Sequence, residues 1–261
     1  MEWTVVTGAS SGLGEGFARR LAADSEALLL IARRGDRLHE IATGLRETHH
    51  TTVEILEADL AEPKDRTRLT NFLEKEPITR LVNNAGVGMN GAFAELDRAA
   101  QTRMVELNCI ALMEACHAVL PGMIERKSGA ILNVASTAAF QPGPWMAVYY
   151  ATKAFVLSLS EALHEEAKSH GVKVAALCPG ATKTEFAAGA DMENSLLFRT
   201  MAGDAESVVA AGVRALASGK AVTVPGLMNA AMAESPRLLP RSLVRKIAAR
   251  FQRPDAGPPE K

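Results

Sequence analysis

The sequence predicts a doubly wound α/β fold, a single parallel β-sheet of about seven strands with helices on both faces, and three observations lead to it. Short runs of aliphatic and β-branched residues alternate with longer amphipathic segments, which is the pattern of repeated βαβ units. The run ALLLIA at 27–32 is apolar throughout, as expected for a strand buried on both faces. A glycine-rich turn directly follows the first such run, at residue 7.

The elements are expected in a regular order along the chain. Strands are predicted at 3–7, 27–32, 52–57, 80–82, 130–135 and 172–177. Helices are predicted at 13–23, 35–48, 63–76, 99–126 and from Tyr149 to just before Gly171. No repeat or low-complexity linker divides the chain, so we expect one domain over 1–252 that includes an amphipathic helix at about 240–251. The Pro/Gly-rich residues 253–261 are expected to form a flexible tail.

Composition narrows the function classes. The net charge of −1 favours neither nucleic acid nor an acidic partner. The three cysteines and six histidines lack ligand spacing, so we expect reduced thiols and no metal site. The opening MEWTVVTGAS lacks the basic region of a signal peptide, and no uninterrupted apolar run approaches the roughly 18 residues of a membrane span. We therefore expect a cytoplasmic protein.

The glycine-rich turn has the properties of a dinucleotide site. In TGASSGLG, glycines 8, 12 and 14 stand between a strand and a helix. Residues without Cβ allow a tight turn and a close approach to a pyrophosphate, which the N-terminus of the helix also attracts. The spacing GxxxGxG differs from GxGxxG, and a tight turn without a ligand is the alternative.

Two arginines follow the second strand where an acid would favour NAD by binding the ribose 2′-hydroxyl. Arg33 and Arg34 stand there instead. A guanidinium suits a 2′-phosphate through charge-assisted, bidentate hydrogen bonds, so the pair predicts NADP(H). The alternative is a pair of solvated arginines in a surface loop.

Tyr149 and Lys153 open the helix that precedes Gly171. They are four residues apart and therefore share a helix face. A nearby cation lowers the pKa of a phenol, which would make Tyr149 a better acid and base near neutral pH. Taken alone, this spacing arises often by chance.

Several segments in the right order resemble the short-chain dehydrogenase/reductase family, in its single-domain, NADP(H)-preferring branch. The matching segments are TGASSGLG at 7–14, Asp59-Leu60, NNAG at 83–86, Asn108, Ser136, Tyr149 with Lys153, and Pro179-Gly180 with Thr182 and Thr184. The resemblance covers roughly residues 3–224 and implies a Rossmann-type fold.

The resemblance also implies residue roles. Ser136 would bind the substrate oxygen, Tyr149 would act as the general acid/base, and Lys153 would stabilise the phenolate. Asn108 would hold a water molecule for proton relay, with a structural asparagine as the alternative. Tyr150 makes YxxK rather than YxxxK and is not expected to be the acid. The implied cofactor-binding residues are Gly8, Ser10, Ser11, Gly12, Leu13, Gly14, Arg33, Arg34, Asp59, Leu60, Asn84, Ala85, Gly86, Tyr149, Lys153, Pro179, Gly180, Thr182 and Thr184.

Apolar residues near these motifs suggest a hydrophobic substrate. The expected wall consists of the segments 137–146 and 87–93, with Phe140, Trp145, Met146 and Phe186 as its named apolar residues, and residues 187–200 are the expected lid. The alternative is that these side chains only pack the lid. A reductase of hydrophobic ketones or aldehydes is the leading function, and a 3-ketoacyl-thioester reductase and a non-catalytic redox sensor are the alternatives.

Two further segments suggest partners. The helices at 99–126 and 149–169 resemble those through which family members form homodimers or homotetramers. The last helix places Leu239, Leu243, Ile247 and Phe251 at every fourth position, with basic residues on the other side. We expect its apolar side to dock on its own domain or on a sister subunit, and peripheral membrane contact is the alternative.

Overall fold

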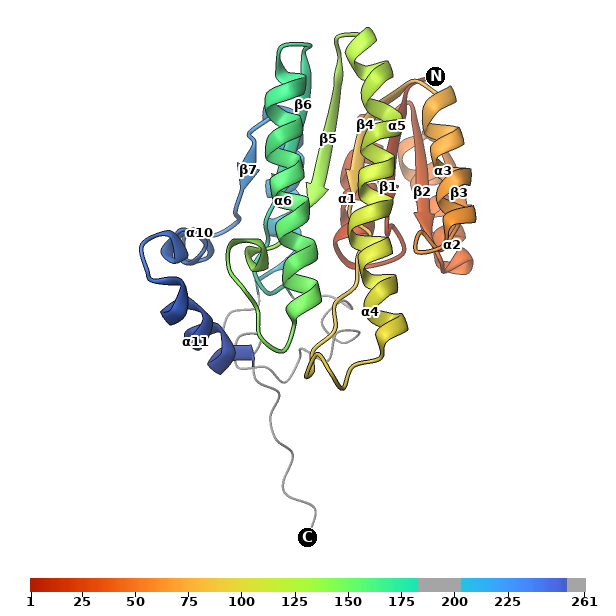
Figure 1. Cartoon of the computed structure of the whole chain (residues 1–261). Helices are drawn as coiled ribbons and strands as arrows, with labels where there is room; N and C mark the ends of the chain where they lie inside the picture. The colour runs from red at the N-terminus through yellow and green to blue at the C-terminus, as the bar shows by residue number, and fades with distance from the viewer. Residues whose placement is uncertain (183–202, 253–261) are drawn as a thin grey trace.

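The computed structural model describes residues 1–182 and 203–252. Within them the chain forms a seven-stranded parallel sheet of order β3-β2-β1-β4-β5-β6-β7 (Figure 1). The strands are β1 (Trp3–Thr7), β2 (Ala27–Ala32), β3 (Thr52–Glu57), β4 (Ile78–Asn83), β5 (Gly129–Val134), β6 (Val172–Leu177) and β7 (Val222–Thr223). The predicted fold class is confirmed.

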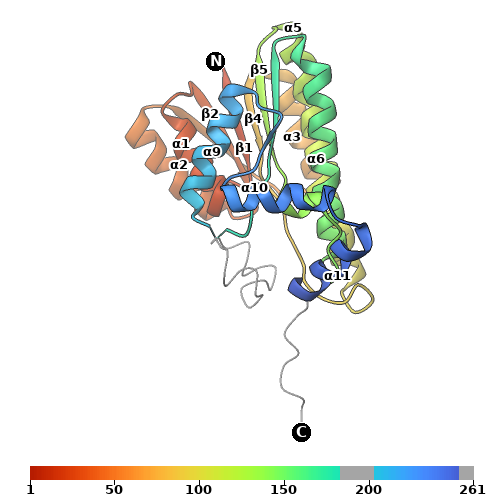
Figure 2. The ribbon, with the colours of Figure 1, turned by 90° about the vertical axis from the view of Figure 1, so that its left-hand side faces the viewer.

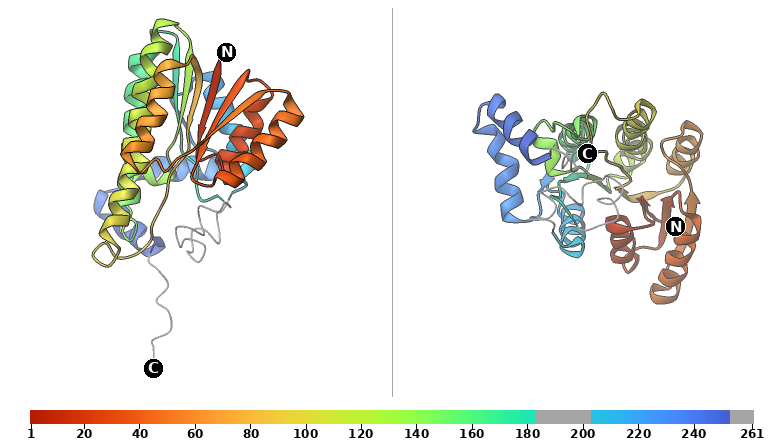
Figure 3. Two further views of the ribbon diagram at one scale, coloured as in Figure 1. Left: turned by 90° about the vertical axis from the view of Figure 1, so that its right-hand side faces the viewer. Right: turned by 90° about the horizontal axis from the view of Figure 1, so that it is seen from below.

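Helices cover both faces of this sheet. They are α1 (Gly12–Ala22), α2 (Gly35–His49), α3 (Pro63–Lys75), α4 (Arg98–Val105), α5 (Leu112–Glu125), α6 (Ala147–Lys168), α9 (Ala205–Ser218), α10 (Leu227–Glu234) and α11 (Arg241–Gln252). α1, α2 and α9 lie on one face, and α3, α5 and α6 lie on the other (Figures 2 and 3).

The core is split by the sheet because successive side chains of a strand point to opposite faces. Val5 and Leu29 join the apolar cluster under α3, α5 and α6. Val6 and Leu28 join the cluster under α1, α2 and α9. The sheet is therefore buried on both faces, which explains the uninterrupted apolar run of β2.

The strand order reverses at β1, which pairs with β2 on one side and β4 on the other. The chain turns away in opposite directions after these strands, so a crevice opens beyond their carboxyl ends. The glycine-rich turn after β1 and the loop after β4 meet there. This edge of the sheet, at the bottom of Figure 1, positions the candidate site.

The helix predicted at 99–126 is interrupted. A π-helical segment at Glu106–Ala111 separates α4 from α5, and such segments are frequent at functional sites. The stretch Arg98–Glu125 contains a window that is long and apolar enough to cross a membrane, with a mean hydropathy of 1.5 over that window. Half of its apolar window is buried, and α5 packs against α3 and β4, as the core helix of a globular fold does.

The C-terminal region differs from expectation. Three elements, α9, β7 and α10, were not predicted from the sequence. β7 has only two residues, which is too short to show an alternating pattern. The last helix is confirmed, but it buries Val244 and Ala248 against the fold instead of the expected stripe. Leu239, Leu243 and Ile247 remain 39%, 43% and 43% exposed, because the helix is rotated so that the stripe lies at the edge of its contact. The expected lid and tail lie outside the described residues.

Candidate active site

The turn after β1 depends on glycine for two different reasons. Gly8 and Gly12 have φ of 67° and 54°, in the left-handed region that favours glycine. Gly14 is needed for space, because a Cβ there would lie 2.0 Å from the backbone oxygen of Gly8. Gly14 therefore packs the first turn of α1 onto the loop and does not itself line the pocket described below.

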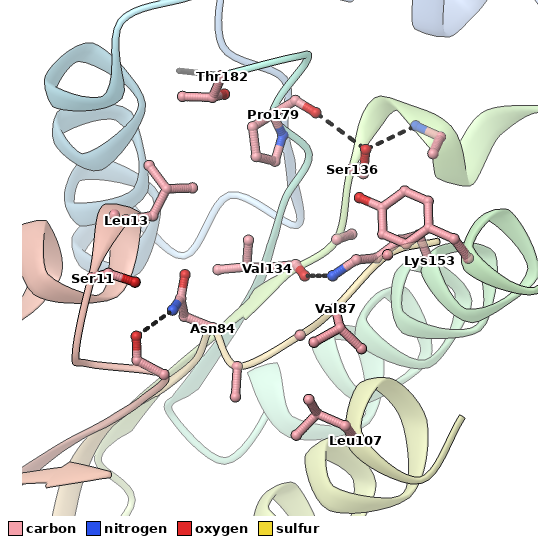
Figure 4. Close-up of a pocket in the computed structure, with 18 of the residues that line it drawn as sticks. Ser11, Leu13, Asn84, Val87, Leu107, Val134, Ser136, Lys153, Pro179 and Thr182 are labelled. Atoms are coloured by element: carbon pink, nitrogen blue, oxygen red, sulfur yellow. Dashed lines mark hydrogen bonds between the residues drawn. The ribbon is translucent and has the colours of Figure 1, made fainter. Parts of the chain in front are cut away.

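The N-terminus of α1 opens toward the pocket. Ser11 occupies the N-cap position, yet its side chain makes no capping hydrogen bond. The N–H groups of a first helical turn have no partner within the helix and favour an anion. Ser10, Ser11, Gly12 and Leu13 line the pocket, and Ser11 and Leu13 are labelled in Figure 4. This arrangement fits the pyrophosphate of a dinucleotide.

Asn84 joins the loops that follow β1 and β4. Its amide nitrogen donates to the backbone oxygens of Thr7 and Gly8, at 3.1 and 3.3 Å (Figure 4). The backbone N–H groups of Asn84 and Ala85 both donate to the Thr7 hydroxyl, at 3.0 Å. These bonds hold the floor of the crevice in one arrangement.

A pocket of about 480 Å³ lies in this crevice. It brings together most of the residues implied by the resemblance, which follow the ends of six strands, β1 to β6, or lie on α6. These are Gly8, Ser10, Ser11, Gly12, Leu13, Arg33, Arg34, Leu60, Asn84, Ala85, Gly86, Ser136, Tyr149, Lys153, Pro179, Gly180 and Thr182. Thr184 and Phe186 lie outside the described residues.

The arginine pair lines the pocket at the end of β2. Arg34 donates from Nε to the Ser10 hydroxyl and from a terminal nitrogen to the Ser10 backbone oxygen, both at 3.3 Å. Both arginines are exposed. Two cations beside an open helix N-terminus make this end of the pocket electropositive.

Asp59, a member of the implied set, does not line the pocket. One carboxylate oxygen accepts from the Ala61 N–H at 3.0 Å, and the other pairs with Arg103 at 2.7 Å. Asp59 thus holds the turn before α3. Leu60, the next residue, does line the pocket.

Asn108 also lies behind the pocket wall rather than on it. Its amide oxygen accepts from the Val87 N–H at 3.0 Å, and its amide nitrogen donates to the Val87 backbone oxygen at 2.9 Å and to the Thr152 hydroxyl at 3.1 Å. The buried amide therefore ties the loop after β4 to α6, which is the structural alternative stated for it. A Cβ on Gly86 would lie 3.2 Å from its oxygen and 3.5 Å from Lys153 Nζ.

Phe140, Trp145 and Met146 of the expected substrate wall do not line the pocket. Met146 is buried in a small apolar cluster with Met104 and the two tyrosines. Trp145 lines a separate cavity of about 20 Å³, and its backbone oxygen accepts from the Gly91 N–H at 2.7 Å. Phe140 packs on the core beneath α5 and α6. Met146 and Trp145 thus support Tyr149 from behind.

Val87, Gly88, Thr137 and Ala138 line the pocket and lie in two segments expected to do so, 87–93 and 137–146. The other wall residues were missed: Ile31, Ala32, Ala58, Leu107, Val134, Ala135, Tyr150, Ala181 and Gln252. Most of them adjoin a motif at a strand end, and that adjacency was the available signal. Gln252 had no such signal, because it is 102 residues from the Tyr150 hydroxyl that it contacts.

Ser136, Tyr149 and Lys153 meet at the centre of the pocket. The Ser136 hydroxyl donates to the Pro179 backbone oxygen at 3.4 Å and accepts from the Ala138 N–H at 3.1 Å (Figure 4). It is also hydrogen-bonded to Tyr149. Lys153 Nζ donates to the Val134 backbone oxygen at 2.8 Å and lies 5.9 Å from the centre of the Tyr149 ring.

Burial has the largest effect on the pKa values of Tyr149 and Lys153. It raises the pKa of Tyr149 to about 12, although the hydrogen bond with Ser136 acts in the opposite direction and lowers it. It lowers the pKa of Lys153 to about 8. The expected lowering of the tyrosine pKa is therefore wrong for the chain alone, since desolvation disfavours the phenolate more than its surroundings stabilise it. Tyr149 is set up as a proton donor.

Comparison with known proteins agrees with this geometry. The pattern of the family described as short chain dehydrogenase matches residues 2–194. The very-long-chain 3-oxoacyl-CoA reductases of Homo sapiens and Rattus norvegicus are both 34% identical to the chain, over 193 and 190 residues. Both alignments cover 71% of this chain, and the chain spans 61% of the length of these relatives.

Two solved structures match over nearly the whole chain. A short-chain dehydrogenase from Sphingobium yanoikuyae in complex with NADPH is 34% identical, with a TM-score of 0.83 and coverage of 93% of this chain and 95% of that one. A bulky-bulky ketone specific alcohol dehydrogenase from Comamonas testosteroni is 31% identical, with a TM-score of 0.79 and coverage of 91% and 92%. The chain belongs to the short-chain dehydrogenase family of oxidoreductases.

Proposed function

We propose that this protein is an NADP(H)-dependent carbonyl reductase that interconverts a hydrophobic ketone or aldehyde and the corresponding alcohol. One observation carries the proposal. A single pocket connects the arginine pair and the glycine-rich turn with Ser136, Tyr149 and Lys153. A dinucleotide bound along it would lie beside the acid/base group.

The pocket residues fit NADP(H) at both ends. Arg33 and Arg34 suit the 2′-phosphate, and the open N-terminus of α1 suits the pyrophosphate. Leu60 and Pro179 offer apolar contacts along the wall. The similar structure from Sphingobium yanoikuyae, in complex with NADPH, supports the same choice.

The chain's own residues would handle the proton and the developing charge. When bound, the nicotinamide supplies or accepts the hydride. The Ser136 hydroxyl donates a hydrogen bond to the substrate oxygen, and Tyr149 transfers its proton to that oxygen. The Lys153 ammonium stabilises the phenolate that remains. The raised pKa keeps Tyr149 protonated, as donation of its proton to the substrate oxygen requires.

The substrate end of the pocket is mainly apolar, with Val87, Leu107 and Ala138 in its wall. A bulky ketone fits it, and the similarity to the Comamonas testosteroni alcohol dehydrogenase extends over 91% of this chain. A 3-oxoacyl thioester is the second candidate substrate, supported by the curated relatives at 34% identity. A redox sensor without catalysis would not need the serine, tyrosine and lysine at one point.

The test is oxidation of NADPH by the purified protein with a panel of bulky ketones, aldehydes and 3-oxoacyl thioesters. We expect turnover of at least one class, with NADH much slower. Faster turnover of the thioesters than of simple ketones would select the second candidate. Tight NADPH binding without turnover in either direction would favour the sensor.

The pH dependence of ketone reduction should follow Lys153. Its pKa of about 8 means that the ammonium is charged below that pH and loses its proton above it. Tyr149 stays protonated throughout, because its pKa is about 12. We expect kcat/KM to be flat between pH 6 and 7.5 and to fall about tenfold per pH unit above about pH 8.5. A flat profile to pH 10 would contradict the assigned role of Lys153.

The proposed enzyme is a homodimer or homotetramer assembled through α4, α5 and α6. Val105, Met113 and Phe155 are exposed on these helices, with small Ala151 and Ala154 exposed beside them. We expect Phe155→Glu to shift the mass measured by light scattering toward the monomer, because a carboxylate cannot be buried unpaired in such an interface. Thr48→Glu, exposed on α2, is the matched control. An unchanged mass for Phe155→Glu would exclude this face.

A further inference from the structure

The last residue of α11 reaches the substrate end of the pocket. Gln252 lines the pocket and is 3% exposed. Ala248 and Val244, four and eight residues earlier, are buried and fix this side of α11 against the fold. The Asn90 side chain donates to the Gln252 backbone oxygen at 3.3 Å. In Figure 1 α11 lies at the same end of the molecule as the carboxyl ends of the strands.

The Gln252 side chain is held by one half of its amide. Its Nε2 donates to the Tyr150 hydroxyl at 2.5 Å. The Tyr150 ring is itself immobilised, because it lies so close to Gly143 that a Cβ there would be 2.2 Å from a ring carbon. The same ring stands edge to face with Tyr149, with 6.1 Å between the ring centres. The amide is therefore one side chain away from the proton donor.

The other half of the amide has no partner among the described residues. Gln252 Oε1 is buried and accepts no hydrogen bond. A buried carbonyl oxygen without a donor is costly, and natural proteins rarely leave one unless it serves a purpose. Gln252 lines the pocket, so a rotation of its amide as the substrate binds can turn this oxygen toward a donor group on the substrate.

We propose that Gln252 determines specificity, its Oε1 accepting a hydrogen bond from a hydroxyl or amide N–H that the substrate carries away from its reacting carbonyl. This inference rests on the proposed carbonyl reductase function. The substrate class becomes a bulky carbonyl compound with a remote donor group. A purely hydrocarbon ketone leaves the amide oxygen unpaired, and such a site discriminates against a ligand that lacks the polar group.

Matched pairs of ligands test the proposal. The probes are aromatic ketones with a terminal hydroxyl on alkyl chains of graded length, and their methyl ethers, which keep an acceptor but lack the donor. Dissociation constants are measured by calorimetry with the NADP⁺-loaded protein, and kcat/KM with NADPH. We expect the unaltered protein to prefer the hydroxyl form about tenfold at one chain length.

Three variants distinguish the amide from its surroundings. Gln252→Met keeps the length of the side chain and should bring the preference to about one while ether binding is retained. Tyr150→Phe removes the hydroxyl that holds the amide and should also reduce the preference for the hydroxyl form. This second variant tests the proposal if Gln252→Met does not fold. Arg250→Gln, exposed on α11 and outside the pocket, should keep the full preference.

The outcomes separate this proposal from the proposed function. An unchanged preference in Gln252→Met, a preference for the ether, or no preference at any chain length would overturn the role of Gln252. Oxidation of NADPH with both members of a pair at equal kcat/KM and equal affinity would leave the reductase function standing without it. A preference in affinity without any NADPH oxidation would support Gln252 and refute the reductase.

Discussion

Replacement of Tyr149 by phenylalanine should lower kcat for carbonyl reduction by about 10²–10⁴-fold, the range for loss of a general acid. The hydroxyl that meets Ser136 is the only part removed, and the ring keeps its place in the buried cluster with Met104 and Met146. We therefore expect NADPH affinity and the thermal unfolding temperature to change little. Stopped-flow measurement of NADPH oxidation, with calorimetry for cofactor binding, checks both expectations.

Tyr150→Phe is the informative comparison, because the two tyrosines are adjacent and both line the pocket. The Tyr150 hydroxyl is hydrogen-bonded to Gln252, and burial raises the pKa of that phenol as well. Among the described residues the Tyr150 hydroxyl is hydrogen-bonded to Gln252 and not to Ser136, so its loss should affect KM more than kcat. A larger loss of kcat in Tyr150→Phe than in Tyr149→Phe would reverse the assignment of the acid.

The sheet was predictable because strands that are buried on both faces are apolar runs in the sequence. β1, β2, β3 and β6 begin and end at the predicted residues, since their apolar runs are bounded by turns, glycine or charge. β7 was not located because two residues carry no pattern. The π-helical segment around Asn108 was not predicted either, because it follows from a side chain that bonds across to Val87 and Thr152.

The site residues also divide into those that the local sequence pattern predicts and those that depend on tertiary contacts. Residues at strand ends, such as Ser136 and Arg33, were placed correctly in the pocket because topology alone brings strand ends together. Trp145 and Met146 do not line this pocket, and the sequence could not show this, since apolar character does not tell which side of a loop faces a cavity. Gln252 is set by the docking of α11, a contact between distant segments that periodicity does not reveal.

The arginine pair should control the choice between NADPH and NADH. We expect Arg33→Ala combined with Arg34→Ala to lower kcat/KM for NADPH by at least about 10- to 150-fold, since even a single charge-assisted hydrogen bond to the phosphate contributes about 1.5–3 kcal/mol. NADH lacks the 2′-phosphate, so its kcat/KM should change less than about threefold. Steady-state kinetics with both cofactors, at low ionic strength and again at higher salt, measures the difference, which salt should reduce.

Arg37→Ala is the matched control for that prediction. Arg37 is a neighbouring cation on α2, but it is paired with Glu15 and Glu40 and does not line the pocket. A general loss of positive potential would weaken NADPH binding in both variants, whereas direct contact with the phosphate affects only Arg33 and Arg34. An equal loss of kcat/KM with NADPH and with NADH in the double variant would mean that the two arginines do not bind the 2′-phosphate. Their role would then be to stabilise the turn after β2, through the hydrogen bonds of Arg34 to Ser10.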